Sequence, residues 1–177
     1  PDSAEAVREL RRSGIDCLAM LTGDSESTAK AVGEALQLDE VHAKCLPADK
    51  VSYMQQYREK LSSGRTLVFV GDGMNDAPVL AQSDVGVAMG GLGSDAAIAA
   101  ADLVILDDKP SKLAFAVRVA RKTMRLAREN IVFALGVKAV ILVLGACGLA
   151  GIGWAVFADV GVSVIAILNA TRAMRQK

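Results

Sequence analysis

Two aspartates frame a short glycine-containing segment that directly follows an apolar run. The apolar run is 66–70, and residues 71–76 read Gly-Asp-Gly-Met-Asn-Asp. Carboxylates at the end of a buried strand, with glycines that permit close backbone approach, are typical of sites for Mg²⁺ and a phosphoryl group. We therefore predict that Asp72 binds Mg²⁺ and that Asn75 and Asp76 orient the groups around it. The alternative is an ordinary Gly-Asp turn between a strand and a helix.

Two further segments carry side chains suited to phosphoryl chemistry. Thr22-Gly23-Asp24 follows another apolar run, and Thr22 offers a hydroxyl and backbone N–H groups to a phosphate oxygen. Lys50 lies near the start of a helix, where its ammonium neutralises charge developing on a phosphoryl group. Each has a simpler explanation, a helix-entry turn for the first and a solvated lysine for the second. His42, the only histidine, has no nearby ligand partner, so we expect a structural role.

The elements that position these residues alternate between short apolar runs and amphipathic segments. We predict strands at residues 15–21, 41–45, 66–70, 85–88 and 102–106. We predict helices at residues 3–13, 25–37, 48–62, 76–82 and 94–100. Strands that alternate with helices of this length form a doubly wound parallel sheet of the α/β class, and ligands bind at the carboxyl ends of its strands. Because Thr22 and Asp72 both follow predicted strands, we expect them at one edge of the sheet.

The second part of the chain has a different composition. Residues 1–110 carry 10 Lys and Arg against 18 Asp and Glu, whereas residues 111–177 carry 10 against 2. Two apolar stretches, 131–150 and 152–170, contain one charge each and are long enough to span a bilayer. Basic residues flank both stretches and the turn at Gly151 has none, so we expect both ends of the chain on the cytoplasmic side. This pattern indicates a membrane, not nucleic acid; two buried helices of a soluble core are the alternative.

Each membrane stretch has one charged residue, Lys138 in the first and Asp159 in the second. A lone charge at such a depth costs about 2.5–3.5 kcal/mol on insertion scales, which favours a functional role. Counted from the turn, their depths differ by roughly 7 Å, which a lysine side chain nearly covers. A carboxylate suits a hard or borderline cation, and the ammonium neutralises it when the cation is absent. The alternatives are a purely structural ion pair and a lysine that reaches to the interface.

The order of these residues along the chain resembles a known superfamily. Thr22, Lys50 and the Asp72/Asp76 pair resemble motifs of haloacid dehalogenase-like phosphotransferases, which include soluble phosphatases. The longer matching strings are Met-Leu-Thr-Gly-Asp at 20–24, Pro-Ala-Asp-Lys at 47–50 and Val-Gly-Asp-Gly-Met-Asn-Asp-Ala-Pro at 70–78. With the basic helix and membrane hairpin that follow, they resemble the P-type ATPases over essentially all 177 residues. This resemblance implies ion pumping driven by an aspartate that ATP phosphorylates beside Asp72-bound Mg²⁺, with Thr22 and Lys50 stabilising the phosphoryl group.

The resemblance also implies a domain organisation and an ion. The expected parts are the C-terminal part of a cytosolic phosphorylation domain at 1–110, a basic connecting helix at 111–130, a transmembrane hairpin at 131–170 and a cytoplasmic tail at 171–177. Gly-Val-Lys at 136–138 and Ala-Asp-Val-Gly at 158–161 resemble the subgroup that exports zinc, cadmium and lead. In that subgroup the lysine and the aspartate serve the transported ion. The corresponding signatures of copper and cobalt pumps are absent from this sequence.

Several parts of such a pump do not occur in this sequence. They are the Asp-Lys-Thr-Gly-Thr phosphorylation loop, the nucleotide-binding domain and a Cys-Pro-Cys membrane helix. The expected partners are therefore ATP, a divalent metal ion, the lipid bilayer of the cell membrane and the remainder of the same polypeptide. We expect the isolated chain to hydrolyse no ATP. Two other functions stay open, a membrane-anchored phosphatase of the same superfamily, which needs an Asp-x-Asp nucleophile, and a non-catalytic interaction module.

Overall fold

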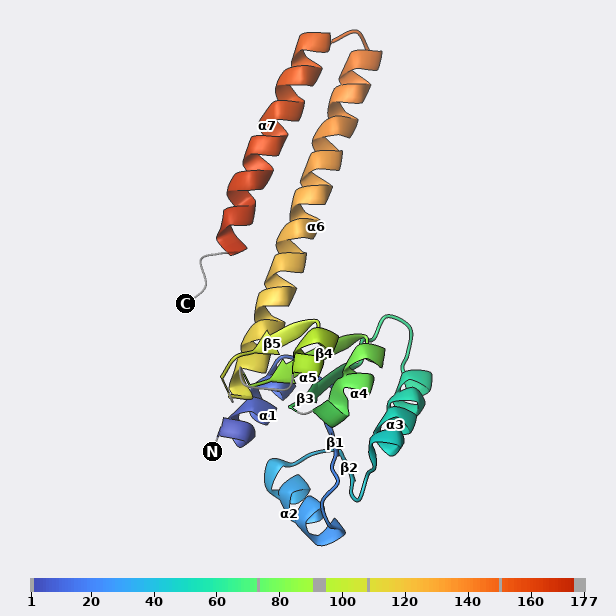
Figure 1. The fold of residues 1–177 in the computed structure, drawn as a ribbon. Helices are drawn as coiled ribbons and strands as arrows, with labels where there is room; N and C mark the ends of the chain where they lie inside the picture. Colours follow the sequence, from blue (N-terminus) through green and yellow to red (C-terminus); the bar gives the residue numbers. More distant parts are fainter. Residues whose placement is uncertain (1, 73, 91–94, 108, 150, 174–177) are drawn as a thin grey trace. The chain divides into compact units, whose positions relative to one another are not determined.

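The computed structural model describes residues 2–72, 74–90, 95–107, 109–149 and 151–173. The chain divides into two compact units, residues 1–114 and 115–177, and each is described by itself. The helices that lie in the first unit are α1 (Asp2–Arg12), α2 (Glu26–Leu36), α3 (Pro47–Lys60), α4 (Ala77–Gln82) and α5 (Asp95–Ala100). Its strands are β1 (Ala19–Leu21), β2 (Glu40–His42), β3 (Val68–Gly71), β4 (Val85–Met89) and β5 (Leu103–Ile105). The predicted alternation of strands and helices is thus confirmed (Figure 1).

All strand pairs of this unit are parallel, as predicted, but the sheet is in two parts. β1 pairs with β2, with Met20 opposite Val41. β3, β4 and β5 form a second sheet in that order, with Val70 opposite Val87. Within the described residues, β1 and β3 are therefore each paired on one side only. The α/β class is confirmed, and the single continuous sheet that we expected is seen as a two-stranded and a three-stranded sheet.

The core of the first unit lies between the three-stranded sheet and two short helices. α4 and α5 contact each other and pack on β3 and β4. Val79 and Leu80 of α4 and Val87 of β4 are fully buried. Gly86 allows this approach, because a Cβ atom there would lie 2.7 Å from the backbone oxygen of Leu80. The close packing brings the residue that precedes α4, Asp76, down onto the end of β3.

Asp39 links the start of β1 to the loop that precedes β2. Its carboxylate accepts hydrogen bonds from the Leu18 N–H at 2.7 Å and from the Arg11 guanidinium at 3.1 Å. These donors favour the ionised form, so the pKa of Asp39 lies below its ordinary value, with the Leu18 N–H as the larger cause and Arg11 as the smaller.

We expect an Asp39→Asn substitution to lower the free energy of unfolding at neutral pH by about 1 kcal/mol, the usual contribution of one hydrogen bond, since solvent screens the partly exposed ion pair. Because the folded-state pKa is lowered, the wild-type protein keeps this benefit above about pH 5 and loses it as the pH falls below about 4. Thermal unfolding of both proteins across this range is the measurement. A difference that stays constant into acid would contradict the assignment.

The second unit is a helical hairpin. α6 (Ser111–Ala146) begins in the first unit and continues without interruption through the predicted basic segment and most of the first apolar stretch. α7 (Ile152–Ala170) returns antiparallel to it and is followed by a short 3-10 turn, η2 (Thr171–Ala173) (Figure 1). Both helices are long and apolar enough to cross a membrane, and almost nothing of their apolar windows is buried in the structure. This exposure argues against the two buried helices of a soluble core.

The first apolar stretch ends as a helix at Ala146, although we expected it to extend to residue 150. Gly148 has a φ of 73°, the left-handed conformation that favours glycine. The Gly148 N–H bonds to the Gly145 oxygen and the Leu149 N–H to the Leu144 oxygen, which together form a Schellman cap. Gly148 therefore stops the helix, and Gly151 instead precedes α7 as its N-cap. Ala150 and the tail residues 174–177 lie outside the described residues.

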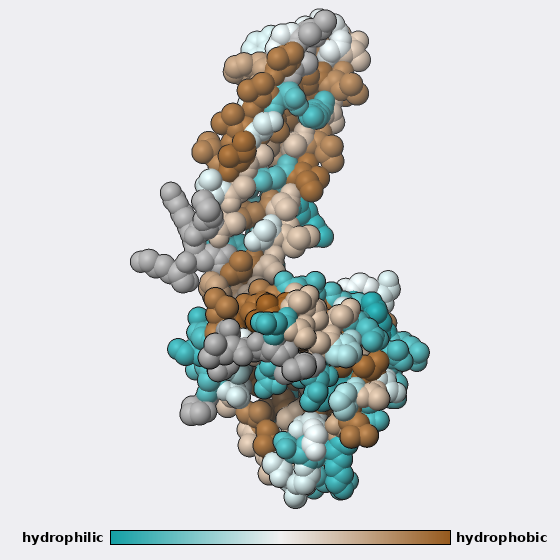
Figure 2. Space-filling model, viewed as in Figure 1, coloured by the Kyte–Doolittle hydropathy of each residue, from teal (hydrophilic) through white to brown (hydrophobic). Residues whose placement is uncertain are grey.

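The surface of the hairpin is largely apolar (Figure 2). Exposed leucine, isoleucine, valine and phenylalanine side chains cover both helices away from their mutual contact. From residue 130 onward, the positions that are at least partly covered recur about every three or four residues, and on α7 they are mostly small. They are Asn130, Ala134, Val137 and Ile141 on α6 and Ala158, Gly161, Val162, Ala166 and Asn169 on α7. Among the described residues, α6 and α7 are connected by the Lys138–Asp159 ion pair and by the hydrogen bonds that Asn130 makes with Ala166 and Asn169.

Candidate functional site

Lys50 and Asp76, 26 residues apart in the chain, meet in a short ion pair. The Lys50 Nζ lies 2.7 Å from Asp76 Oδ1, and both side chains are largely buried, with 17% and 9% of their surface exposed. Lys50 projects from the first turn of α3, and Asp76 ends the 3-10 turn η1 (Met74–Asp76), which joins β3 to α4. A buried charge of either sign is costly without its partner, so each holds the other in place.

Asp76 reaches the end of β3 because residue 71 has no side chain. A Cβ atom on Gly71 would lie 2.8 Å from Asp76 Cβ and 3.0 Å from its Oδ2. The close backbone approach that we predicted for this segment is thus present at its first glycine. The second glycine, Gly73, lies outside the described residues.

We expect a Gly71→Ala substitution to push Asp76 away from Lys50 and to lower the phosphoryl-transfer activity of this site by about 100-fold, the effect of a displacement of roughly 1 Å. The measurement is phosphate incorporation from ATP by the full-length polypeptide. The double variant with Lys50→Met should lose no more activity than Lys50→Met alone, because Gly71→Ala acts only by displacing Lys50 through Asp76. If the two losses multiply, Gly71 acts independently of this ion pair and the prediction is wrong.

Thr22 lies just past the end of β1 in a tight turn. Its hydroxyl donates to Asp24 Oδ2 at 3.0 Å and accepts from the Asp24 N–H at 3.2 Å, which leaves the intervening Gly23 at the tip. The Thr22 N–H is bonded to the His42 oxygen at 2.9 Å, so our expectation that it is offered to phosphate is wrong. The hydroxyl is the group of Thr22 that can turn toward a phosphate oxygen. This turn is tied to the start of α3, because the Cys45 N–H donates to the Thr22 oxygen.

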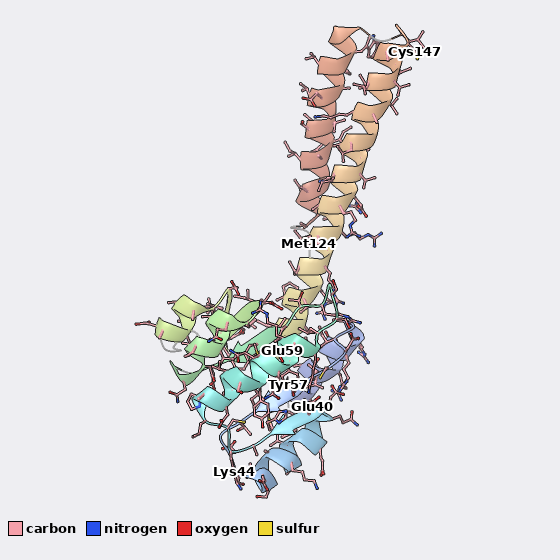
Figure 3. The ribbon with its side chains drawn as sticks, turned by 90° about the vertical axis from the view of Figure 1, so that its right-hand side faces the viewer. Glu40, Lys44, Tyr57, Glu59, Met124 and Cys147 are labelled. Carbon is pink, nitrogen blue, oxygen red and sulfur yellow. The ribbon has the colours of Figure 1, made fainter. Side chains whose placement is uncertain are left out.

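α3, which carries Lys50, is anchored at its other end to both sheets. Tyr57 and Glu40 of β2 lie close together (Figure 3), and the Tyr57 hydroxyl donates to Glu40 Oε2 at 2.6 Å. The same hydroxyl lies 2.8 Å from His42 Nε2. Burial and the nearby Glu40 carboxylate raise the pKa of Tyr57, and the Tyr57 hydroxyl in turn lowers the pKa of Glu40. On the opposite side, Arg58 pairs with Asp84, before β4, at 2.6 Å. His42 thus has the structural role that we expected.

Asp72 and Asn75 are exposed side chains at the carboxyl end of β3. A carboxylate and an amide oxygen are hard oxygen donors, which fit Mg²⁺, an ion that is usually held by one or two carboxylates together with water and phosphate. Among the described residues there is no cluster of three or more potential metal ligands. The oxygen atoms of Asp72 and Asn75 therefore suit part of the ligand set of a Mg²⁺ ion. Asp76 is engaged by Lys50, so it is placed to support this site and not to bind the ion directly.

Lys138 and Asp159 form an ion pair within the hairpin, at 2.9 Å between Nζ and Oδ1. The expectation that the lysine spans the difference in depth is confirmed. The pair lies in a groove of about 810 Å³ between α6 and α7, lined mainly by apolar residues that include Ile141, Leu142 and Val156. A carboxylate neutralised by a mobile ammonium in apolar surroundings can exchange that ammonium for a metal cation.

The residues that hold these groups in place were not predicted from the sequence. Tyr57, Glu40 and Asp84 were not identified, since surface polar residues on helices and loops carry no distinctive pattern. Asn130 and Asn169, described below, were also missed. Their signal was present, because each is an amide at the edge of an apolar stretch.

Comparisons with known proteins agree with the fold and with the motifs. The sequence model of the haloacid dehalogenase-like hydrolase family matches residues 1–84. The chain is 55% identical over 99% of its length to the cadmium, zinc and cobalt-transporting ATPase of Bacillus subtilis (strain 168), of which it covers 25%. It is 53% identical over 97% of its length to the zinc-transporting ATPase of Synechocystis sp. (strain ATCC 27184 / PCC 6803 / Kazusa), of which it covers 24%.

A solved structure matches both units. It is the crystal structure of a zinc-transporting PIB-type ATPase in the E2.Pi state, with a TM-score of 0.89 and 35% identity over 98% of this chain and 28% of that chain. The chain therefore spans about a quarter of the length of the relatives that it matches. The predicted resemblance is confirmed in sequence and in fold.

Proposed function

We propose that the chain is part of an ATP-driven export pump for Zn²⁺, Cd²⁺ or Pb²⁺, because over nearly its whole length it is similar to heavy-metal-transporting P-type ATPases, of which it spans about a quarter. Its first unit supplies half of the phosphorylation site, and its second unit supplies charged groups of the ion pathway. The pump lies in the cell membrane, with both ends of this chain on the cytoplasmic side. The remainder of the polypeptide supplies the phosphorylated aspartate and most of the ATP-binding surface.

The buried pair of Lys50 and Asp76 is the observation that carries the catalytic part of this proposal. The pair places a cation beside the carboxyl end of β3, next to Asp72. An ammonium held there stabilises the charge of a transferring phosphoryl group, and the Thr22 hydroxyl is placed to bind one of its oxygens. Mg²⁺ bound to Asp72 would neutralise phosphate charge. Asn75 orients the groups around that site, while Gly23 and Asp24 shape the Thr22 turn.

The open edges of β1 and β3 support the view that the nucleophile comes from outside this chain. Each of these strands is paired on one side only within the described residues. Val68 and Val70, which share one face of β3, are each 40% exposed, although both faces of a parallel sheet are normally covered. We infer that a strand from the remainder of the polypeptide pairs with these edges. The aspartate at its carboxyl end then lies at the same edge as Thr22 and Asp72.

The ion pair of the hairpin supports the transport part of the proposal. Asp159 supplies a carboxylate ligand to the transported ion, and Lys138 neutralises that carboxylate after the ion has left. In such a pump the state of the phosphorylation site biases the arrangement of the helices. α6 can carry this coupling, because it is one continuous helix from Ser111 to the ion pair.

The test uses the full-length polypeptide, purified and reconstituted in lipid. We expect ATP hydrolysis that is stimulated by Zn²⁺, Cd²⁺ or Pb²⁺ but not by Cu⁺, together with an acid-stable phosphoenzyme formed from ATP. The isolated 177-residue chain is expected to show neither. Hydrolysis of small phosphate esters with Mg²⁺ alone, without stimulation by Zn²⁺, Cd²⁺ or Pb²⁺, would instead identify a phosphatase. The absence of both activities, with retained binding to other proteins, would identify an interaction module.

A further inference from the structure

A chain of hydrogen bonds joins α6 and α7 at the end of the hairpin away from the connecting turn. The Asn130 amide donates to the Ala166 carbonyl at 3.1 Å, and the Asn169 amide donates to Asn130 Oδ1 at 2.8 Å. Arg172 donates to Asn169 Oδ1 at 3.0 Å. We call Asn130 and Asn169, with these bonds, the amide clamp. Each side-chain oxygen of the clamp accepts a hydrogen bond and each amide nitrogen donates one. The donor directions are therefore consistent along the whole series of hydrogen bonds.

The amide clamp and the ion pair are separate cross-links on one helix–helix contact. Asn130 precedes Lys138 by about two helical turns, roughly 12 Å, and Asn169 follows Asp159 by nearly three, roughly 15 Å. The covered positions between them, including Ala134 and Val162, are small or apolar and contribute no other hydrogen bond between the two helices. Packing of this kind tolerates rotation and sliding of one helix along the other, because lipid tails are as apolar as the helix surfaces.

An apolar pair at these two positions would suit a membrane hairpin better if packing alone mattered. Amides are costly to place within a helix pair in lipid, and they are retained where a single arrangement must be specified, as a buried asparagine specifies the register of a coiled coil. Two amides that bond to each other and to one carbonyl of α7 define both the sliding and the rotation of the helices. Both asparagines are among the partly covered positions of a hairpin whose surface is mostly exposed.

We propose that Asn130 and Asn169 are positioning residues of the ion pathway, which hold α6 and α7 in the register that brings Lys138 to Asp159. This inference rests on the proposed transport function. The clamp itself does not touch the ion. It determines how readily the ammonium returns to the carboxylate, and therefore how strongly it competes with a metal ion for Asp159.

The experiment uses the full-length polypeptide in lipid and the variants Asn130→Leu and Asn169→Leu. We expect the Zn²⁺ concentration for half-maximal ATPase stimulation to change by about threefold to tenfold, since a side-chain hydrogen bond between membrane helices is worth about threefold in an equilibrium. The KM for ATP and the rate at saturating metal should stay within about twofold of the wild-type values. A general loss of structure would change both of these quantities. Thr171→Ala is the control, because the bond that the described residues show for its hydroxyl goes to the Leu168 carbonyl three residues earlier, and it should change nothing.

A double-mutant cycle with Lys138→Ala distinguishes positioning from a general structural role. If the clamp acts through the ion pair, Asn169→Leu has no further effect on metal half-saturation once Lys138 has been removed. If Asn169→Leu shifts the metal half-saturation equally with and without Lys138, the proposal is overturned. It is also overturned if the asparagine variants leave metal half-saturation unchanged, as Thr171→Ala should. If the leucine variants fail to fold, Asn169→Asp serves instead, since it keeps the acceptor for Arg172 and loses the donor to Asn130. A wild-type protein without metal-stimulated phosphorylation would overturn the proposed function itself, and it is measured first.

Discussion

Replacing Lys50 with methionine in the full-length polypeptide is expected to lower ATP hydrolysis by about 100- to 1000-fold, the usual effect of removing one group that stabilises transition-state charge. The methionine fills most of the space but carries no charge. It therefore removes the cation from the transferring phosphoryl group and also leaves the buried carboxylate of Asp76 without its partner. The measurements are steady-state ATPase activity and phosphoenzyme formation, with thermal stability recorded in parallel.

Two further variants separate the role of Lys50 in catalysis from its role in stability. Lys44→Met is the matched control, since Lys44 pairs with Glu26 at 3.3 Å and both side chains are mostly exposed, so activity should change less than about twofold. The double variant Lys50→Met/Asp76→Asn removes both charges and should recover stability without recovering turnover. If turnover returns with stability, the lysine serves only to neutralise Asp76, and a direct role at the phosphoryl group is wrong.

Replacing Asp159 with alanine is expected to abolish binding of the transported ion. Metal stoichiometry should fall, and the metal concentration for half-maximal ATPase stimulation should rise by about 100-fold or more, the loss expected when a charged ligand is removed from a low-dielectric site. The direct measurement is metal bound per purified full-length polypeptide. Because the Asp159 side chain is 61% exposed in the hairpin, we expect the thermal midpoint to move by no more than about 2 °C.

A neighbouring substitution controls for effects on the helix itself. Ser163→Ala lies one turn from Asp159 and removes only a hydroxyl that bonds to the Asp159 carbonyl at 2.9 Å, so metal binding should be retained. Asp159→Asn keeps the shape of the side chain and removes its charge, and it should behave like the alanine variant. Unchanged metal stoichiometry in Asp159→Ala would show that the pair with Lys138 is purely structural.

The strands and helices of the first unit were predictable because each carries a local pattern. The buried runs 66–70 and 85–88 are short, apolar and followed by turns, and helix stops such as Gly14 are read directly from single residues. Gly14 has a φ of 74°, as a helix stop requires. The end of α6 was less predictable. Gly148, Gly151 and Gly153 are all possible stops, and only the backbone bonds at Gly148 decide between them.

The pairing of distant groups could not be derived from any local pattern. Lys50 was singled out for its place at the start of a helix and for its motif, and neither indicates that it meets Asp76 in a buried ion pair. The division of the sheet between β1 and β3 could not be predicted from the strand pattern either. An edge strand with a missing neighbour has the same sequence pattern as a central strand.

The Asp72 segment, the Thr22 turn and the single charges of the two apolar stretches predict the chemistry from sequence alone, because the types of residue that bind Mg²⁺, phosphate and metal ions are few and their spacing is local. Tertiary structure decided how those residues act on one another. It assigned Asp76 to Lys50, committed the Thr22 N–H to β2, and brought the Lys138 ammonium to the Asp159 carboxylate within a hairpin whose helices two asparagines also connect by hydrogen bonds. These are contacts between distant segments, and their geometry depends on packing that no single stretch of residues contains.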